Sequence, residues 1–214
     1  MNRRVFLAAS AAACVATPAA AQVFNFDAAA TYAAERRGVS LLAMRRGELI
    51  FEDYPSEGGP TRGWELASGT KSFTGIMCAA AIQDGLISSW DEHAADTLTE
   101  WRNDDRRAIT IRQLLSLTSG ISGGPIARPP TYADAIAQQA EAAPGERFAY
   151  GPTSFQIFGE IMRRKTNGDP LDYLTRRIFS PLGIEPTAWR RGADGMPHMP
   201  SGAGLTARDW ARFG

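Results

Sequence analysis

The sequence predicts a single domain of the α/β (α+β) class. Two apolar or alternating segments, 39–44 and 48–54, flank Arg45-Arg46-Gly47 and are typical of a β-hairpin. Helical patterns dominate the rest of the chain, which shows no internal repeat and no linker between domains. A hydrophobic content of 44% and a formal net charge of zero argue against disorder and against a nucleic-acid partner.

The first 21 residues have the features of an export signal. Arg3 and Arg4 make a positive start, residues 5–15 are an apolar run too short to span a bilayer, and residues 19–21 are typical of a cleavage site. The two arginines before Val5-Phe6-Leu7 also resemble a twin-arginine signal, so both the Sec and the twin-arginine route stay open. We therefore expect a periplasmic or secreted protein.

The mature domain, residues 22–214, contains one cysteine, Cys78, so an intramolecular disulfide is impossible. No apolar stretch after residue 21 is long enough for a membrane span. The histidines, His93 and His198, and the single cysteine have no metal-ligand spacing, and we expect neither a metal nor another cofactor.

Helices are predicted in the first half of the domain from composition and stop residues. The Ala-rich segment 27–37 ends at Gly38, which is typical of a helix stop. Segment 68–84 is apolar on nearly every side and ends at Gly85, which predicts a buried helix. Segment 109–117 is predicted to form a further short helix.

Helices also dominate the predicted second half. Segment 132–143 ends before Pro144, segment 154–165 has one apolar face, and segment 171–179 follows after a stop at Asn167-Gly168. Thr206 is expected to cap a final helix over 207–213. The glycine- and proline-rich segments 119–130 and 180–204 are predicted to be loops.

Ser68 and Lys71 are the strongest candidates for chemistry. A serine hydroxyl is a poor nucleophile until a base takes its proton. Positions i and i+3 share one helical face, so a helix that begins at Ser68 holds Lys71 beside the hydroxyl. The lysine must be neutral to act as that base, and burial and the positive end of the helix dipole both disfavour its ammonium form.

Two other interpretations of serine residues stay open. Ser68 can be no more than an N-cap of its helix. Residues 120–124, GISGG, match the G-x-S-x-G pattern around Ser122, but a nucleophile elbow requires a strand before the serine and a helix after it. A predicted helix precedes this segment and Pro125 follows it, which favours a glycine-rich loop.

The run from Leu66 to Gly75, LASGTKSFTG, resembles the serine β-lactamase and D,D-peptidase superfamily. The similarity is greatest to the branch that contains class C β-lactamases, D,D-carboxypeptidases and related esterases. Residues 83–92, 109–120 and 202–209 resemble further family segments in the same order. The resemblance implies a β-lactamase/transpeptidase-like fold, an antiparallel sheet flanked by helices with an inserted helical region.

The resemblance also implies a role for Tyr150. The family's second motif is Tyr-x-Asn after Pro-Gly and an aromatic residue, and residues 144–152, PGERFAYGP, occupy that place. By this resemblance Tyr150 is the phenolic partner of Lys71, which helps to deprotonate Ser68 and then protonates the leaving group. The alternative is a tyrosine that only packs against the next helix.

Pro152 departs from the family pattern, because it stands where an asparagine is expected. Proline has no carboxamide, so it cannot hold the lysine and a substrate amide carbonyl as the family implies for that asparagine. Thr153 or Ser154 is expected to replace it only in part. This departure weakens the β-lactam and peptide interpretations more than the ester interpretation, since a simple ester has no amide side chain to hold.

The family's sheet is completed by later strands, one of which carries a Lys/His-x-Gly motif and supplies a second oxyanion N–H beside that of Ser68. The sequence ends at Gly214, before any such segment. We therefore expect the front part of a longer enzyme without its C-terminal strands, and we expect residues 22–214 alone to be inactive or poorly folded.

Together these observations predict an exported serine hydrolase of this superfamily. Its acyl-enzyme would form at Ser68, with Lys71 and Tyr150 as proton-transfer groups, and the substrate would be an ester, a β-lactam or a D-amino-acid peptide. One alternative is a non-catalytic relative that binds peptidoglycan-like ligands or a protein partner. A second, less favoured alternative is an esterase of the α/β-hydrolase type that uses Ser122.

Overall fold

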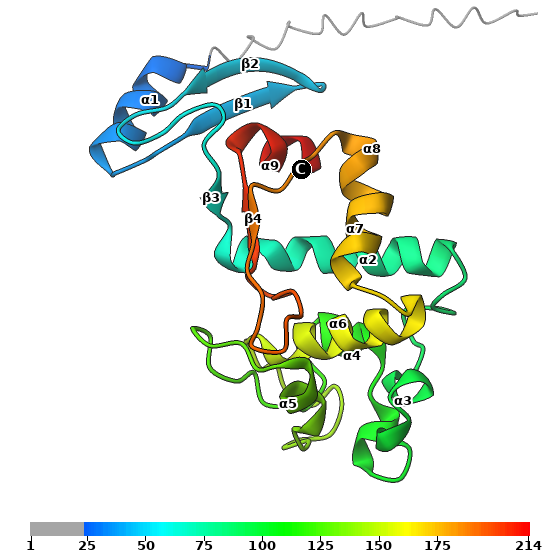
Figure 1. Ribbon diagram of the computed structural model, residues 1–214. Coiled ribbons are helices and arrows are strands. Elements are labelled where there is room, and N and C mark those ends of the chain that lie inside the picture. The colour runs from blue at the N-terminus through cyan, green and yellow to red at the C-terminus, as the bar shows by residue number, and fades with distance from the viewer. Residues whose placement is uncertain (1–23) are drawn as a thin grey trace, which may run out of the picture.

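A central helix, α2 (Lys71–Gln83), crosses the middle of the computed structural model, which describes residues 24–214. The β1–β2 hairpin and α9 lie on one side of this helix, and the region of α3 to α6 lies on the other (Figure 1). Helix α7 and the turn after it pack against α2. The export signal predicted over residues 1–21 lies outside the described residues.

Short helices and strands alternate along the chain. The first half contains α1 (Phe26–Glu35), β1 (Leu41–Arg45), β2 (Glu48–Asp53), β3 (Trp64–Glu65), the 3-10 helix η1 (Ala67–Thr70), α2, α3 (Ala94–Thr97), the 3-10 helices η2 (Thr99–Trp101) and η3 (Asp105–Ala108), and α4 (Ile111–Leu115). The second half contains α5 (Tyr132–Ala137), α6 (Thr153–Thr166), α7 (Pro170–Leu174), the π-helical η4 (Thr175–Phe179), α8 (Ser180–Leu182), β4 (Ala188–Trp189), β5 (Ala203–Leu205) and α9 (Ala207–Phe213).

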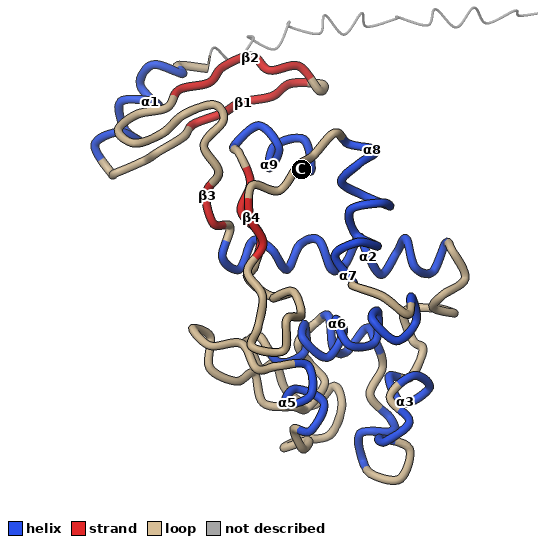
Figure 2. The backbone as a smooth tube through the Cα atoms, in the orientation of Figure 1, coloured by secondary structure: helices blue, strands red, loops and turns tan. Residues whose placement is uncertain are grey.

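The described strands form two separate antiparallel sheets (Figure 2). The predicted hairpin is present as β1 and β2, and its turn at Arg46-Gly47 has positive φ at both residues, as tight hairpin turns require. The second sheet has the order β3-β5-β4. It corrects the expectation that segment 180–204 is loop throughout, because β4 and the start of β5 lie in it. Strands of two or three residues are too short to show a periodic pattern.

Helix α2 begins and packs differently from the prediction. The segment around Ser68 forms the 3-10 turn η1, and the α-helix begins only at Lys71. The helix is also not buried on every side: Phe73 and Met77 are fully buried, whereas the side chain of Ile76 is 47% exposed. Mostly small apolar residues follow Ile76, so the sequence alone does not distinguish its buried face from its exposed face.

Of three other predicted helix boundaries, one differs in the structure and two agree. The predicted helix over 132–143 ends at Ala137, because Ala140 pairs with Ile121 in an isolated β-bridge. Helix α6 ends at Thr166, and its C-cap Asn167 adopts the left-handed conformation (φ 51°), which agrees with the predicted stop. Thr206 caps α9 as predicted, since its side chain accepts a hydrogen bond from the Asp209 N–H.

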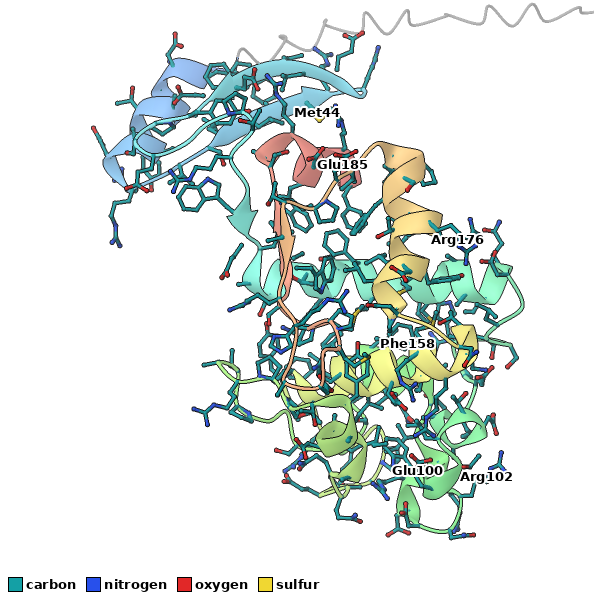
Figure 3. The ribbon with its side chains drawn as sticks, in the orientation of Figure 1. Met44, Glu100, Arg102, Phe158, Arg176 and Glu185 are labelled. Atoms are coloured by element: carbon teal, nitrogen blue, oxygen red, sulfur yellow. The ribbon has the colours of Figure 1, made fainter. Side chains whose placement is uncertain are left out.

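Within residues 24–214 the core consists of two clusters of buried apolar side chains. The larger cluster packs α2 against α6 and η4, and in it the ring of Phe73 meets the edge of Phe179 at a centroid distance of 5.0 Å. The second cluster, around Leu98 and Trp101, joins α3, η2 and η3 to α6. Phe158 of α6 lies among the packed side chains in Figure 3, which also labels Glu100 and Arg102 at the outer edge. Burial of each large apolar side chain contributes about 1.5–3 kcal/mol, so the two clusters hold α6 firmly between them.

Candidate active site

Ser68 lies in the 3-10 turn η1, directly after strand β3. The residue before it, Ala67, has φ 46°, a left-handed conformation that costs a non-glycine residue about 1 kcal/mol. Strain of this kind persists only where the surrounding structure imposes it. At this turn the constraint comes from β5, because the Leu66 N–H donates a 2.9 Å hydrogen bond to the carbonyl oxygen of Ala203.

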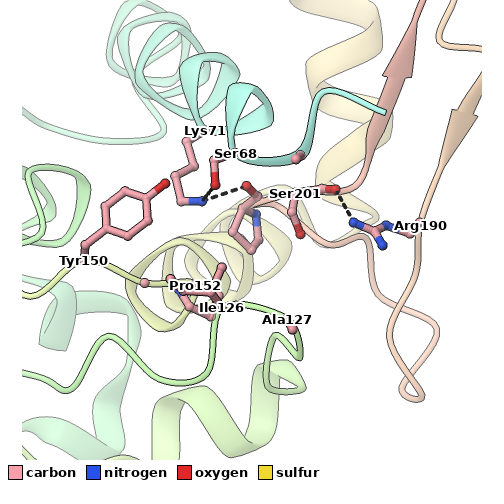
Figure 4. Close-up of a pocket in the computed structure, with 11 residues that line it drawn as sticks. Ser68, Lys71, Ile126, Ala127, Tyr150, Pro152, Arg190 and Ser201 are labelled. Atoms are coloured by element: carbon pink, nitrogen blue, oxygen red, sulfur yellow. Dashed lines mark hydrogen bonds between the residues drawn. The ribbon is translucent and has the colours of Figure 1, made fainter. Parts of the chain in front are cut away.

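The amine of Lys71 contacts the hydroxyl of Ser68. The distance from Lys71 Nζ to Ser68 Oγ is 2.9 Å, and the same Nζ donates to the carbonyl oxygen of Pro200 at 3.0 Å. Figure 4 shows the contact between Lys71 and Ser68. The proximity that the i, i+3 spacing predicts is therefore present, although η1 rather than an α-helical turn provides it. Because one amine proton is directed to Pro200, the nitrogen is held in reach of the serine proton.

Residues 198–205, which we call the strap, hold this arrangement from the other side. The strap contains Pro200 and strand β5, which pairs with β3 so that Trp64 faces Leu205. The buried hydroxyl of Thr70 accepts a 3.2 Å hydrogen bond from the Ala203 N–H. The nucleophile turn is thus attached to the strap on both sides of Ser68.

Tyr150 reaches the site from the loop that precedes α6. Its side chain is 46% exposed, and its ring centroid lies 5.1 Å from Lys71 Nζ. The loop packs directly on a second backbone segment: a Cβ atom on Gly151 would lie 2.0 Å from the carbonyl oxygen of Gly123. Only glycine fits there, so the contact fixes the backbone on which Tyr150 stands. In Figure 4 the phenol oxygen points toward Lys71 and Ser68.

The surroundings change the acidity of both proton-transfer candidates. Burial lowers the pKa of Lys71, and the nearby Tyr150 opposes that shift in part. The Ser68 hydroxyl lowers the pKa of Tyr150, and the positive charge on Lys71 lowers it further. Both shifts favour the protonation states that base catalysis needs, a neutral amine and an ionisable phenol.

These residues line a pocket of about 290 Å³. Ile126, Ala127 and Pro152 form an apolar part of its wall, and Arg190 and Ser201 form a polar part. Ser68, Lys71 and Tyr150, far apart in the sequence, therefore open into one cavity, where a carbonyl group can approach the serine oxygen.

Neither residue expected to replace the missing asparagine lines this pocket. The hydroxyl of Thr153 donates to the carbonyl oxygen of Gly123 at 3.0 Å, and that of Ser154 lies 3.3 Å from the hydroxyl of Ser119. Both side chains are buried. The partial replacement expected from Thr153 or Ser154 is therefore wrong, because both hydroxyls hold the loops beneath the pocket.

The G-x-S-x-G segment does not form a nucleophile elbow. Ser122 follows an isolated bridge at Ile121, and an irregular segment continues to Thr131 instead of a helix. His198 is half-buried in the strap. His93 is the N-cap of α3 and pairs with Thr110 in an isolated bridge. Within residues 24–214 no helix is both long and apolar enough to cross a membrane.

Three contributors to the site, Thr70, Pro200 and Arg190, are not among the residues predicted from the sequence. Thr70 lies inside the motif, but its partner Ala203 is 133 residues away. Pro200 acts through its backbone carbonyl, which leaves no signature in the side-chain pattern. Arg190 lies in a segment rich in glycine and proline, where only the adjacent aromatic residue, Trp189, indicates a strand.

Comparison with known proteins gives a match over nearly the whole described chain. The family model described as Beta-lactamase matches residues 25–214. Protein flp of Staphylococcus aureus strain N315 is 26% identical over 72% of this chain and 35% of its own length. The lovastatin esterase of Penicillium rubens is 29% identical over 56% of this chain and 37% of its own length. The chain thus spans roughly a third of the length of these curated relatives.

A likeness in three dimensions accompanies the sequence match. The solved structure of a proposed β-lactamase from Bacteroides dorei superposes with a TM-score of 0.73. It is 22% identical, and the likeness covers 87% of this chain and 60% of the other. At this identity the likeness shows the fold alone.

Proposed function

Since this chain belongs to the Beta-lactamase family, we propose that it is a serine hydrolase that forms an acyl-enzyme at Ser68. The β-lactamase/transpeptidase-like fold predicted from the sequence is confirmed by the family match and the structural likeness. The observation that carries the proposal is the 2.9 Å contact between Lys71 Nζ and Ser68 Oγ. Both residues line the pocket.

The first half of the proposed reaction acylates the serine. Neutral Lys71 takes the hydroxyl proton while Ser68 Oγ bonds to the substrate carbonyl carbon, whose oxygen becomes an oxyanion. The Ser68 N–H lies in the first turn of η1, where main-chain N–H groups have no partner inside the helix, and it is suited to donate to that oxyanion. The bond to the leaving group then breaks, and the leaving group takes a proton relayed through Tyr150.

The second half releases the acid. A water molecule gives one proton to the Lys71–Tyr150 pair and attacks the ester carbonyl of the acyl-enzyme. The bond from that carbonyl carbon to Ser68 Oγ breaks, and the serine oxygen recovers its proton. The residues return to their starting protonation states, so the net change is hydrolysis of one ester by one water.

An ester is the substrate class that Pro152 favours. The apolar side chain of Pro152 lines the pocket at the position of the family's asparagine, whose carboxamide would bind an amide. The nearby hydroxyls of Thr153 and Ser154 make hydrogen bonds to other residues. An esterase is also among the relatives with a described activity, the lovastatin esterase of Penicillium rubens. Faster hydrolysis of β-lactams than of simple esters would contradict this part of the proposal.

Export is a separate part of the proposal. Its support is the sequence of residues 1–21, with a basic start, an apolar run and a small-residue cleavage site. Cell fractionation and N-terminal sequencing test it: we expect a periplasmic or secreted protein that begins at Gln22. A cytoplasmic protein that keeps residues 1–21 would contradict export without affecting the catalytic proposal.

Covalent labelling tests the nucleophile. The full-length gene product is treated with a fluorophosphonate or a penicillin, and the adduct is located by peptide mass spectrometry. We expect the adduct on Ser68, its loss in Ser68→Ala, and no loss in the matched control Ser122→Ala. An adduct on Ser122 would instead support the α/β-hydrolase alternative, and no adduct on any serine would support a non-catalytic ligand-binding relative.

A further inference from the structure

Arg190 is a pocket residue with no part in the proposed proton transfers. Among the described residues that line the pocket, Lys71 and Arg190 carry the ionisable basic groups, and none is an aspartate or a glutamate. Arginine keeps its charge at any working pH, whereas a lysine with a lowered pKa loses it more easily. Arg190 is therefore the lasting positive charge of the cavity.

The guanidinium of Arg190 is oriented by one hydrogen bond and makes one long, exposed ion pair. Its Nη2 donates to the carbonyl oxygen of Ser201 at 3.1 Å, which ties the side chain to the strap. Its Nε lies 3.7 Å from the carboxylate of Glu65, beyond hydrogen-bond distance. Both side chains of this pair are well exposed, at 48% and 63%, and surface ion pairs of this kind contribute little to stability. A guanidinium has five N–H donors, so most of them remain available to a ligand.

The position of Arg190 indicates which part of a substrate it meets. Figure 4 shows Tyr150 at one end of the pocket and Arg190 at the other, with Ser68 and Lys71 between them. In the proposed function Tyr150 delivers a proton to the leaving group, so the leaving group lies at the Tyr150 end. The acyl group on the opposite side of the scissile bond then extends toward Arg190.

We propose that Arg190 binds a carboxylate at the far end of the substrate's acyl group, so that the preferred substrates are monoesters of dicarboxylic acids. This inference rests on the proposed function. The planar fork of a guanidinium matches the two oxygens of a carboxylate. The apolar wall of Ile126, Ala127 and Pro152 suits the short alkyl chain that joins the carboxylate to the ester carbonyl.

A pair of esters with the same leaving group isolates the effect of the charge. Mono(4-nitrophenyl) glutarate and 4-nitrophenyl pentanoate have acyl chains of equal carbon number, and only the glutarate ends in a carboxylate. We expect the full-length gene product to have a higher kcat/KM for the glutarate. Arg190→Gln should lower the glutarate-to-pentanoate ratio of kcat/KM by about tenfold, since hydrogen bonds to charged groups have this magnitude. Arg190→Lys should lower the ratio less.

Arg191→Gln is the matched control, because it removes the same charge one residue away. The guanidinium of Arg191 contacts Asp169 and the carbonyl oxygen of Gly195, and it does not line the pocket. We expect the glutarate-to-pentanoate ratio of kcat/KM in Arg191→Gln to equal that of the wild type. An unchanged ratio in Arg190→Gln, with pentanoate still hydrolysed, would overturn the role of Arg190 and leave the proposed function intact.

A binding measurement covers the case in which neither ester is hydrolysed, which would count against the proposed function. The stable amide analogue, glutaric mono(4-nitroanilide), is titrated calorimetrically into the wild type and Arg190→Gln. Binding that weakens about tenfold in the variant supports the carboxylate site. Equal binding to the two proteins, or no binding to either, overturns it.

Discussion

The amine of Lys71 donates a 3.0 Å hydrogen bond to the carbonyl oxygen of Pro200, which lies 129 residues later in the chain. The same amine lies 2.9 Å from the hydroxyl of Ser68. The candidate base is thus held between its nucleophile, three residues before it, and a carbonyl of the strap. Its orientation depends on the pairing of β3 with β5, which brings the strap beside the nucleophile turn.

Removal of the candidate base should abolish most activity without unfolding the protein. Lys71→Met keeps the apolar stem but has no group that accepts a proton, and general base catalysis contributes about 10²–10⁴ in rate. We expect kcat/KM for 4-nitrophenyl acetate to fall by that factor. Lys71→Arg is the companion variant: it keeps a positive charge but cannot act as a base at neutral pH, and it should be equally inactive. A Lys71→Met protein with more than about a tenth of wild-type kcat/KM would contradict the role of Lys71 as base.

The pH dependence of the reaction should reveal the coupling of Lys71 to Tyr150. Burial lowers the pKa of Lys71, so kcat/KM for a neutral ester should rise with pH and level off below the range of an ordinary lysine. Tyr150 raises the pKa of Lys71, so Tyr150→Phe should move this rise to lower pH as well as lower the rate. In Tyr54→Phe, a change just after β2 that leaves the pocket untouched, we expect the pH of this rise to stay the same. A rise that moves to higher pH in Tyr150→Phe would contradict the expected effect of Tyr150 on the pKa of Lys71.

A methyl group at Gly151 should displace Tyr150. The Cβ atom of Gly151→Ala would meet the Gly123 carbonyl oxygen at 2.0 Å. Because that oxygen belongs to the backbone, one of the two loops must move. We expect kcat to fall at least about tenfold, because small displacements of a catalytic group are costly. The control is Gly75→Ala in α2, where nothing outside the helix lies within 4 Å of the new atom. That variant should keep its activity and gain about 0.5–1 kcal/mol of stability.

Local features of this fold could be predicted from the sequence. The hairpin, the stop at Asn167 and the cap at Thr206 depend on residues within one or two turns of each other, so composition and spacing reveal them. The proximity of Ser68 and Lys71 belongs to the same class, because a single helical turn fixes it.

Non-local features could not be predicted in this way. Strands β4 and β5 are two and three residues long, and they exist because their partners lie beside them, not because of their own pattern. The exposed side of α2 at Ile76 and the end of α5 at Ala137 are likewise set by packing and by a distant bridge. Arg190 reaches the pocket only because β4 pairs with β5.

The hydroxyl of Thr70 provides a test of the strap itself. It is buried, it makes no cap to α2, and it accepts the hydrogen bond of the Ala203 N–H. Thr70→Val has nearly the same shape but leaves that N–H buried without a partner, which costs about 1–3 kcal/mol. We expect the free energy of unfolding, measured in urea, to fall by this amount. Because the strap also carries Pro200, kcat/KM for 4-nitrophenyl acetate should fall with it.

Thr74→Val is the matched control for this variant. Thr74 is also buried in α2, but its hydroxyl donates to the carbonyl oxygen of Lys71, one turn earlier in the same helix. In an α-helix this carbonyl also accepts a hydrogen bond from the N–H four residues later in the chain. The substitution therefore leaves no buried backbone group without a partner. We expect Thr74→Val to lose clearly less stability than Thr70→Val and to keep its activity. Equal effects of the two substitutions would show that the Thr70–Ala203 hydrogen bond does not position the strap, and that the alignment of Lys71 has another origin.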